Sequence, residues 1–326
     1  MPSSGGPSFS GQFDAMFNPE NGGKGFPKTP QHLIQFIRQV PTGKFIMQRR
    51  VVSRDLAELN NRLLSEEKSG LGALSKVQVM AQGSIGDELG TLEADFANMV
   101  IGGGSMDYGC VQEEIKFSIC PEMNVSRLYC EVMEDNEAIV LIGGEQFAKH
   151  KGYAFSLQYD GDYVDTRKDE SGNITVQTVA IDAIRFVGSM NQFESGMINR
   201  ELLKAFAGFY EPSAEAPKTR ISTGNWGCGA FNGDKQLKFV IQWIAASLCQ
   251  RDLVYYTFDK GPLASEIQHF IDSVNGVTVQ EMYAALMKLS WICAQNNIQP
   301  PDTFNHLLTI LGKKGELNTA TRCTIQ

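Results

Sequence analysis

Strand-like and helix-like patterns alternate along the chain from about residue 74 to residue 312, and this alternation constrains the fold more than any other feature. The run Glu137–Ile142 (EAIVLI) and the run 174–187 are apolar and rich in β-branched residues, as buried strands are. The clearest helix is predicted over 234–250, where apolar residues recur every three or four positions. Such alternation is typical of an α/β protein with a mixed sheet between helices.

The remaining elements extend the same pattern to both sides. Short strands are predicted at 77–79, 92–100, 219–222 and 253–258, and helices at 112–120, 193–210, 263–274, 278–296 and 302–311. Amphipathic spacing between 30 and 72 predicts helices there too. Residues 1–30 contain 15 Gly, Pro or Ser and are expected to form a loose tail. We therefore divide the chain into a tail (1–30), a helical accessory segment (31–73), a main domain (74–312) and a C-terminal tail (313–326).

Composition excludes several classes of protein. Of the 326 residues 42% are hydrophobic, which is enough for a full core and excludes an intrinsically disordered chain. The net charge of −8 argues against a protein that holds nucleic acid mainly through phosphate contacts. No window of 18 apolar residues predicts a membrane span, and the N-terminus does not resemble a secretory signal. Seven cysteines without a CxxC pair and four scattered histidines predict reduced thiols and no metal site.

A glycine-rich loop lies between a short predicted strand and the strongest predicted helix. The segment TGNWGCGAFNGD (223–234) has glycines at 224, 227, 229 and 233. Glycines let backbone N–H groups approach an anion, and the helix N-terminus adds a positive dipole end. The spacing matches neither GxxxxGK[ST] nor GxGxxG, which disfavours a P-loop NTPase or an ordinary dinucleotide dehydrogenase. The loop is either a phosphate cradle or a tight turn without a ligand, and Trp226 and Phe231 are either core side chains or walls against a base or sugar.

A second glycine-rich bend precedes two adjacent carboxylates. The segment from Asp95 to Phe117 carries three consecutive glycines and then Gln112, Glu113 and Glu114. Adjacent carboxylates are ordinary on an exposed helix, but burial would raise the pKa of one of them and suit it to general acid catalysis. Neighbours on a helix point about 100° apart, so the two are not expected to face each other across one glycosidic bond. One acid and one substrate-positioning residue is the better hypothesis.

Taken together, these segments resemble the poly(ADP-ribose) glycohydrolases. The signature of that family is a triple glycine followed by Gln-Glu-Glu, and here seven residues separate Gly102–Gly104 from Gln112–Glu114. Further matches are DFAN (95–98), VSRL (125–128), EQFAKHKGYA (145–154), VAIDAI (179–184), TGNWGCGAF (223–231) and VYYTF (254–258). The resemblance covers residues 75–260. It implies a macrodomain, a three-layer α/β/α sandwich on a mixed sheet with helical accessory elements, which agrees with the α/β pattern.

The resemblance also implies roles for individual residues. Glu114 would protonate the leaving ribose oxygen and then activate water, while Glu113 would hold ribose hydroxyls. Asp95 would complete the catalytic set. The loop 225–230 would bind the diphosphate, Phe231 would pack on the ribose, and aromatic side chains would wall the adenosine. The expected substrate-binding residues are Ile85, Gly86, Asn98, Gln112, Tyr153, Asn225, Trp226, Gly227, Cys228, Gly229, Ala230, Phe231 and Phe258.

The implied reaction is hydrolysis of the ribose–ribose O-glycosidic bonds of poly(ADP-ribose), which releases ADP-ribose and needs no cofactor and no metal. The expected partners are the polymer, ADP-ribose and poly(ADP-ribosyl)ated proteins, with no membrane and no sequence-specific nucleic acid. We expect an intracellular monomer in the nucleus or cytoplasm, linked to the DNA damage response. Many relatives have Ile-Glu where this chain has Ile85-Gly86, and an aromatic residue at His150. The alternatives are a macrodomain that only binds ADP-ribose and an unrelated structural α/β protein.

Overall fold

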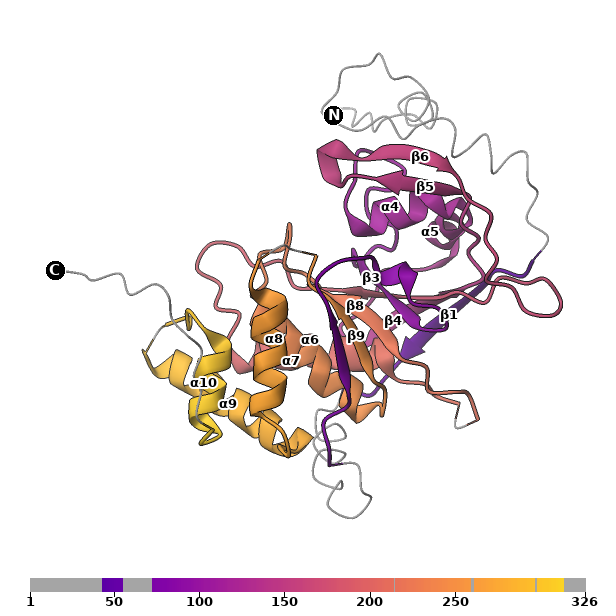
Figure 1. Cartoon of the computed structure of the whole chain (residues 1–326). Helices are drawn as coiled ribbons and strands as arrows, with labels where there is room; N and C mark the ends of the chain where they lie inside the picture. Colours follow the sequence, from indigo (N-terminus) through magenta and orange to yellow (C-terminus); the bar gives the residue numbers. More distant parts are fainter. Residues whose placement is uncertain (1–42, 55–71, 214, 259–260, 297, 314–326) are drawn as a thin grey trace, which may run out of the picture. The chain divides into compact units, whose positions relative to one another are not determined.

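The computed structural model describes residues 43–54, 72–213, 215–258, 261–296 and 298–313, and these fall into two compact units. Of the described residues, the first unit contains 43–51 and 89–183, and the second contains 52–54, 72–88 and the described residues from 184 to 313. Figure 1 shows their helices and strands. Among the described residues, no helix combines the length and the apolar character that crossing a membrane requires.

Four strands of the first unit lie side by side in a mixed arrangement. Their order is β1-β4-β7-β3, with β1 and β7 antiparallel to β4, and β3 parallel to β7. Almost every residue of β4, β7 and β3 is buried, so their side chains do not alternate between apolar and polar as they would in a strand with one exposed face. The strands are β1 (Ile46–Val51), β3 (Leu92–Ala97), β4 (Glu137–Ile142) and β7 (Gln177–Asp182).

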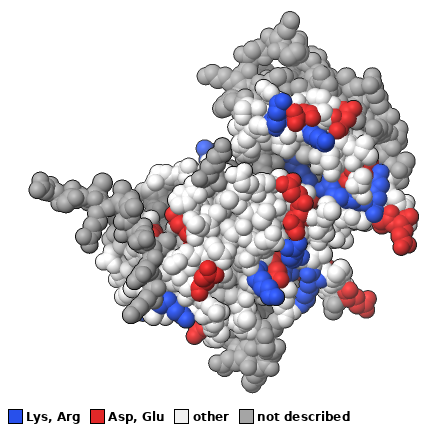
Figure 2. Space-filling model, in the orientation of Figure 1, with Lys and Arg blue, Asp and Glu red and all other residues white. Residues whose placement is uncertain are grey.

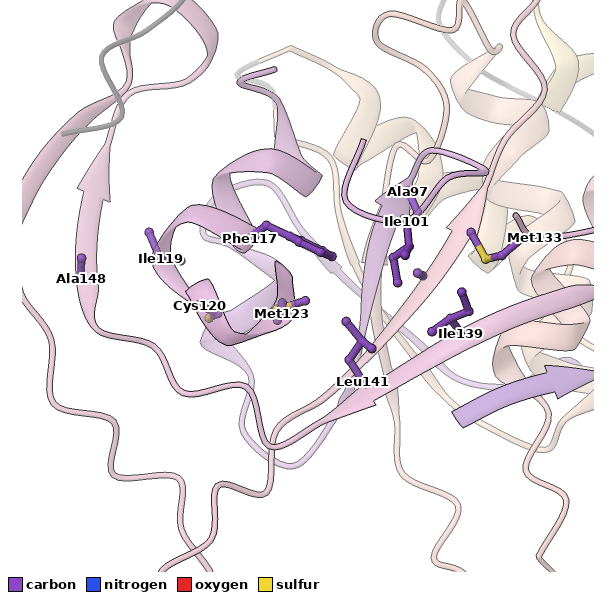
Figure 3. Close-up of a cluster of buried hydrophobic side chains, with 11 residues drawn as sticks. Ala97, Ile101, Phe117, Ile119, Cys120, Met123, Met133, Ile139, Leu141 and Ala148 are labelled. Atoms are coloured by element: carbon purple, nitrogen blue, oxygen red, sulfur yellow. The ribbon is translucent and has the colours of Figure 1, made fainter. Parts of the chain in front are cut away.

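Short helices and a small hairpin complete the first unit. Helix α4 (Gln112–Ile119) contacts β3 and β5, and α5 (Ser126–Tyr129) follows the turn η3 (Pro121–Val125). The antiparallel pair β5 (Ala148–Lys151) and β6 (Gln158–Asp162) is joined through the turn η4 (Ala154–Ser156). A hydrophobic cluster holds α4 and η3 against β4 and β7 (Figure 3). Its buried members are Ala97, Ile101, Phe117, Ile119, Cys120, Met123, Met133, Ile139, Leu141, Ala148 and Ala180.

The second unit has three parallel strands in the order β8-β9-β2 and five helices among its described residues. Helix α7 is the centre of its helical part, since it contacts α6, α9 and α10, and every residue from Leu237 to Leu248 is buried. The elements are β2 (Val77–Met80), η2 (Ile85–Asp87), α6 (Ser195–Phe209), β8 (Ile221–Gly224), α7 (Lys235–Leu248), β9 (Leu253–Tyr256), α8 (Leu263–Ser273), α9 (Val279–Asn296) and α10 (Thr303–Ile310).

The sequence predicts most of these elements in place, and several of its predictions need correction. The predicted strand 92–100 ends at Ala97. A strand, β1, occupies 46–51, where the sequence pattern predicts a helix; the rest of that segment, like the two tails, lies almost wholly outside the described residues. The predicted strand 174–187 shortens to β7, and the predicted strand 253–258 ends at Tyr256. The apolar pattern continues around β7 because flanking residues such as Ile174, Val176 and Phe186 are also buried, whereas Phe258, after β9, is exposed. The domain boundaries at 30, 73 and 312 stay a prediction.

Candidate active site

The two adjacent glutamates begin helix α4, and Glu113 is tied to the loop before it. Its carboxylate accepts hydrogen bonds from the backbone N–H of Asn98 at 2.9 Å and of Gly102 at 2.5 Å. Only 2% of the residue is exposed. The side chain is therefore fixed by the turn that follows β3, and its position depends on the backbone of the glycine bend.

The carboxylate of Glu114 is hydrogen-bonded to both ends of the loop between Gly104 and Val111. One carboxylate oxygen, Oε1, accepts from the N–H of Gly104 at 3.0 Å, and the other, Oε2, accepts from the N–H of Val111 at 3.0 Å. Val111 is the N-cap residue of α4 and has no side chain that could cap the helix, so Glu114 supplies that contact itself. With 8% exposure it is the more accessible of the two glutamates.

The glycines are required because the backbone passes very close to these carboxylates. A Cβ at Gly103 would lie 2.7 Å from an oxygen of each glutamate, and one at Gly109 would lie 2.6 Å from Cγ of Glu114. Gly103 also has a φ of +44°, in the left-handed region that favours glycine. A Cβ at Gly104 would come within 2.9 Å of the Gly109 backbone. The spacing of the motif thus reflects the packing of a glycine loop around two carboxylates.

Asp95 on β3 is the third carboxylate of this cluster. It is completely buried, and neither of its oxygens has a hydrogen-bond partner. Burial, together with the charge of Glu114, raises its pKa from 3.8 to about 8. Burial and the charge of Asp95 also raise the pKa of Glu113 well above its usual value. We call Asp95, Glu113 and Glu114 the carboxylate cluster; within it, burial and the neighbouring charges favour the protonated forms of Asp95 and Glu113.

Polar side chains on α4 fix the helix to β3. The Gln112 amide accepts a hydrogen bond from the N–H of Phe96 at 2.7 Å and donates one to the carbonyl of Ala94 at 3.0 Å. One turn later, Lys116 forms an ion pair with Glu93 at 2.6 Å. Gln112, expected from sequence to contact the adenosine, thus holds α4 on β3.

The hairpin β5–β6 brings Tyr153 to the carboxylate cluster. Its phenol hydroxyl hydrogen-bonds the backbone of Gln112, and burial is the largest cause of its raised pKa, with the charge of Glu114 contributing. Tyr153 is nevertheless 55% exposed. A largely open aromatic ring beside a buried carboxyl is suited to contact a sugar or base.

The glycine-rich loop of the second unit, residues 225–233, joins β8 to α7. It is closed by hydrogen bonds from the N–H of Cys228 to the carbonyl of Asn225 at 3.0 Å and from the N–H of Gly233 to that of Gly227 at 2.9 Å. Asn225 donates to the carbonyl of Thr257, which ties the loop to the end of β9. The exposed residues 229 and 230 lie at its tip, and Asp234 caps the helix that follows by accepting from the N–H of Leu237.

Trp226 supports this loop from within. Its side chain is fully buried, and the Lys238 ammonium lies 4.1 Å from the centre of its ring. Lys238 in turn forms an ion pair with Glu201 of α6, and Glu201 also accepts from Arg200 at 2.9 Å. Of the two alternatives that the sequence leaves open for Trp226, its burial matches a core side chain. Phe231 is half-buried.

Phe258 lies on the other side of the loop's base and has a strained backbone. Its φ is +52°, which is unusual for an aromatic residue, and its ring is 47% exposed. The ring stacks on Tyr256 with centroids 5.9 Å apart, and a Cβ at Gly224 would lie 2.5 Å from it. Nearby, Ser222 donates to the carbonyl of Ile85, which places the Ile85-Gly86 turn beside β8.

The cations near the glycine-rich loop are largely engaged with acidic groups. Arg220 pairs with Glu88, and Lys238 is buried on Glu201. On the face seen in Figure 2, the Lys and Arg groups of the described residues lie among Asp and Glu groups rather than along one stripe. Within the described ranges, no three His, Cys, Asp or Glu side chains are grouped so that they could share a metal ion.

Comparison with known proteins assigns a family to this geometry. The family model of the poly(ADP-ribose) glycohydrolases, described as having the macro domain fold, matches residues 65–265, which is more than half of the chain. The chain belongs to the poly(ADP-ribose) glycohydrolase family. The matched residues include both glutamates, the glycine bend before them and the glycine-rich loop of the second unit. The mixed α/β architecture predicted from the sequence is therefore confirmed as the macrodomain fold of this family.

Several glycohydrolases are similar to this chain over most of its length. Poly(ADP-ribose) glycohydrolase 1 of Caenorhabditis elegans is 37% identical over 235 residues, which cover 68% of this chain and 30% of the relative. Poly(ADP-ribose) glycohydrolase 2 of the same organism is 32% identical over 260 residues, which cover 76% of this chain and 52% of the relative. The chain thus spans about a third to a half of these relatives. A crystal structure of the Deinococcus radiodurans enzyme with ADP-ribose is 14% identical with a TM-score of 0.38, covering 76% of this chain and 99% of that one.

In this glycohydrolase-family chain, each unit gathers a different part of the predicted site. Asp95, Asn98, Glu113, Glu114 and Tyr153 come together in the first unit. The second unit holds the loop 225–231 with Phe258, Ile85 and Gly86. Sequence reasoning missed two supporting groups, the Glu201–Lys238 pair and Arg127, whose guanidinium contacts the glycine bend. In the sequence, Arg127 is marked only by its place in the VSRL motif. Lys238 is marked by its position within the strongly apolar helix predicted over 234–250.

Proposed function

We propose that this protein hydrolyses the ribose–ribose O-glycosidic bonds of poly(ADP-ribose) and releases ADP-ribose. The observation that carries the proposal is the carboxylate cluster, in which two buried glutamates are held by backbone N–H groups of the glycine bend. Burying three carboxyl groups together is unfavourable for folding, and such sites concentrate where a proton must be transferred. The curated relatives named poly(ADP-ribose) glycohydrolase support the same substrate.

The carboxylate cluster supplies the proton that the reaction needs. Glu114, the more exposed glutamate, protonates the leaving ribose oxygen and, as a carboxylate, then activates the water that attacks the oxocarbenium-like carbon. The raised pKa values of Glu113 and Asp95 favour their protonated forms, and a protonated Glu113 can donate a hydrogen bond to a ribose hydroxyl. Their neutral forms also reduce the repulsion that a polyanionic substrate would meet.

The glycine-rich loop holds the diphosphate of the unit being released. Its exposed tip at residues 229 and 230 presents backbone groups beside the N-terminus of α7, where a helix favours an anion. In the second unit, the half-exposed ring of Phe258 contacts the adenosine moiety; in the first, the half-exposed ring of Tyr153 contacts a sugar beside the carboxylate cluster. We expect polymer attached to poly(ADP-ribosyl)ated proteins to be a substrate. The six described cysteines form no disulfide, which favours a reducing compartment such as the nucleus or cytoplasm.

Turnover distinguishes this activity from binding alone. A macrodomain that only binds ADP-ribose would use the glycine-rich loop, but it would have no use for two glutamates buried against the glycine bend. The experiment incubates purified poly(ADP-ribose) with a small molar fraction of the protein and measures free ADP-ribose over time by chromatography. Release of many equivalents per protein is expected. Tight ADP-ribose binding without release would assign the protein to the binding class.

A further inference from the structure

Arg127 is the one cationic side chain that the described structure places directly on the glycine bend. It lies on the single-turn helix α5, and its Nη1 donates to the carbonyl of Gly103 at 2.5 Å and to Oγ of Ser105 at 3.2 Å. The residue is half-buried. An arginine that caps a backbone carbonyl contributes more than a neutral donor would, because the hydrogen bond is charge-assisted.

The contacted carbonyl belongs to the same peptide group as a donor to Glu114. The C=O of Gly103 accepts from Arg127, while the N–H of Gly104, on the opposite side of that planar peptide, donates to Oε1 of Glu114. A cation at the oxygen polarises the peptide and strengthens its N–H as a donor. We infer that Arg127 is a positioning residue that acts on Glu114 through the Gly103–Gly104 peptide.

The stem of Arg127 explains the remaining glycine of the triplet. A Cβ at Gly102 would lie 3.0 Å from Cγ, Cδ and Nη1 of Arg127, and the φ of Gly102 is +84°. Gly102 thus makes room for the arginine on one side of the bend, while Gly103 makes room for the two glutamates on the other. The bend is held between a cation and the carboxylates, and neither side tolerates a Cβ without displacement.

The second contact of Arg127 leads back to the catalytic helix. Ser105 donates to the side-chain oxygen of Asn124 at 2.7 Å, and the amide of Asn124 donates to the carbonyl of Phe117 in α4 at 3.0 Å. The position of the guanidinium is therefore fixed by the helix that carries Glu114. Arg127 itself lies behind the peptide and so affects the rate through the placement of Glu114.

The test is steady-state kinetics of Arg127→Met, which keeps an apolar stem against Gly102 and removes the guanidinium. This inference rests on the proposed function, so wild-type release of ADP-ribose is measured first. We expect kcat to fall about 10- to 100-fold, the range for loss of a charge-assisted hydrogen bond, with ADP-ribose affinity within about threefold. Arg127→Lys should be intermediate, because an ammonium can reach the carbonyl but lacks the planar fork.

Arg49→Met is the matched control. Arg49 lies in the same unit, pairs with Glu137 and donates to the carbonyls of Glu131 and Val132, and these three partners lie outside the glycine bend. Its loss should lower the melting temperature and leave kcat unchanged. Guanidinium added below its denaturing range should restore part of kcat to Arg127→Ala and none to wild type.

Each outcome decides between the possibilities. Unchanged kcat in Arg127→Met would overturn the inference while leaving the proposed function intact. Equal losses of kcat in Arg127→Met and Arg49→Met would also overturn it, since that result indicates general destabilisation. If Arg127→Met does not fold, the kcat of Arg127→Lys and the guanidinium rescue of Arg127→Ala decide. Failure of the wild-type protein to release ADP-ribose would instead refute the proposed function.

Discussion

Replacing Gly109 by alanine should impair catalysis by displacing Glu114 from its place against the glycine bend. The new Cβ would lie 2.6 Å from Cγ and 2.7 Å from Cδ and Oε1 of Glu114, whereas ordinary contacts begin near 3.4 Å. Gly109 is not among the residues with positive φ, so alanine introduces no backbone strain there. The effect of this substitution therefore comes from the contact with the glutamate.

The distances set the expected magnitude. Relief of the overlap requires Glu114 or the loop to shift by about 0.8 Å, and a misplacement of about 1 Å at a reacting group costs on the order of 100-fold in rate. We therefore expect kcat to fall about 30- to 100-fold. The overpacking itself should lower the unfolding free energy by about 1–3 kcal/mol. ADP-ribose affinity should change little, because the glycine-rich loop is untouched.

The assay combines polymer hydrolysis, calorimetric titration with ADP-ribose and thermal unfolding. Gly196→Ala in helix α6 is the matched control, since a Cβ there meets nothing within 4 Å. That substitution should leave kcat unchanged and raise stability by about 0.5–1 kcal/mol, because glycine inside a helix is unfavourable. A kcat for Gly109→Ala within about threefold of wild type would refute the claim that the glycine bend fixes the catalytic carboxyl.

Three further predictions concern the supports of the site. Lys238→Met should lower the unfolding free energy by about 3 kcal/mol, which is at the low end for a broken buried ion pair because Arg200 still reaches Glu201. Adding Glu201→Gln to this variant should recover part of the loss in denaturant titrations, and no recovery would contradict the pairing. Phe258→Ala should weaken ADP-ribose binding by about 1–3 kcal/mol in calorimetry, and unchanged affinity would remove its ring from the binding site. Because the folded-state pKa of Asp95 is raised from 3.8 to about 8, its contribution to stability is present at low pH and lost as pH rises through that window. The melting temperature of Asp95→Asn relative to wild type should therefore increase from pH 5 to pH 8, and a constant difference would refute the raised pKa.

The sequence predicts best those elements whose own residues are buried and are therefore mostly apolar. The run Glu137–Ile142 is apolar after its first residue, and it forms β4 with the predicted bounds. Strand β1 (IMQRRV) lies at the end of the order β1-β4-β7-β3 and keeps polar side chains, so its pairing with β4 is visible only in the folded chain. The hairpin β5–β6 escaped prediction for the same reason, since AKHK and QYDGD are mostly polar.

The candidate site shows the same division between local pattern and long-range contact. The motif located the glycine bend and the two glutamates, but their burial contradicts the ordinary expectation of an exposed helix face. That burial depends on backbone N–H groups about ten residues earlier, which no periodicity encodes. Likewise, the position of Phe258 depends on a positive φ after the end of β9, which nothing in the sequence indicates for a phenylalanine.

The most direct test of the central claim is ADP-ribose release by Glu114→Gln, measured beside its affinity for ADP-ribose. The glutamine keeps the shape of the side chain and cannot deliver a proton, and general acid–base catalysis contributes about 10²- to 10⁴-fold. The account predicts that release from purified polymer falls by at least about 100-fold while the Kd for ADP-ribose stays within a few-fold of wild type. Release at more than about a tenth of the wild-type rate would contradict the assignment of Glu114 as the catalytic acid.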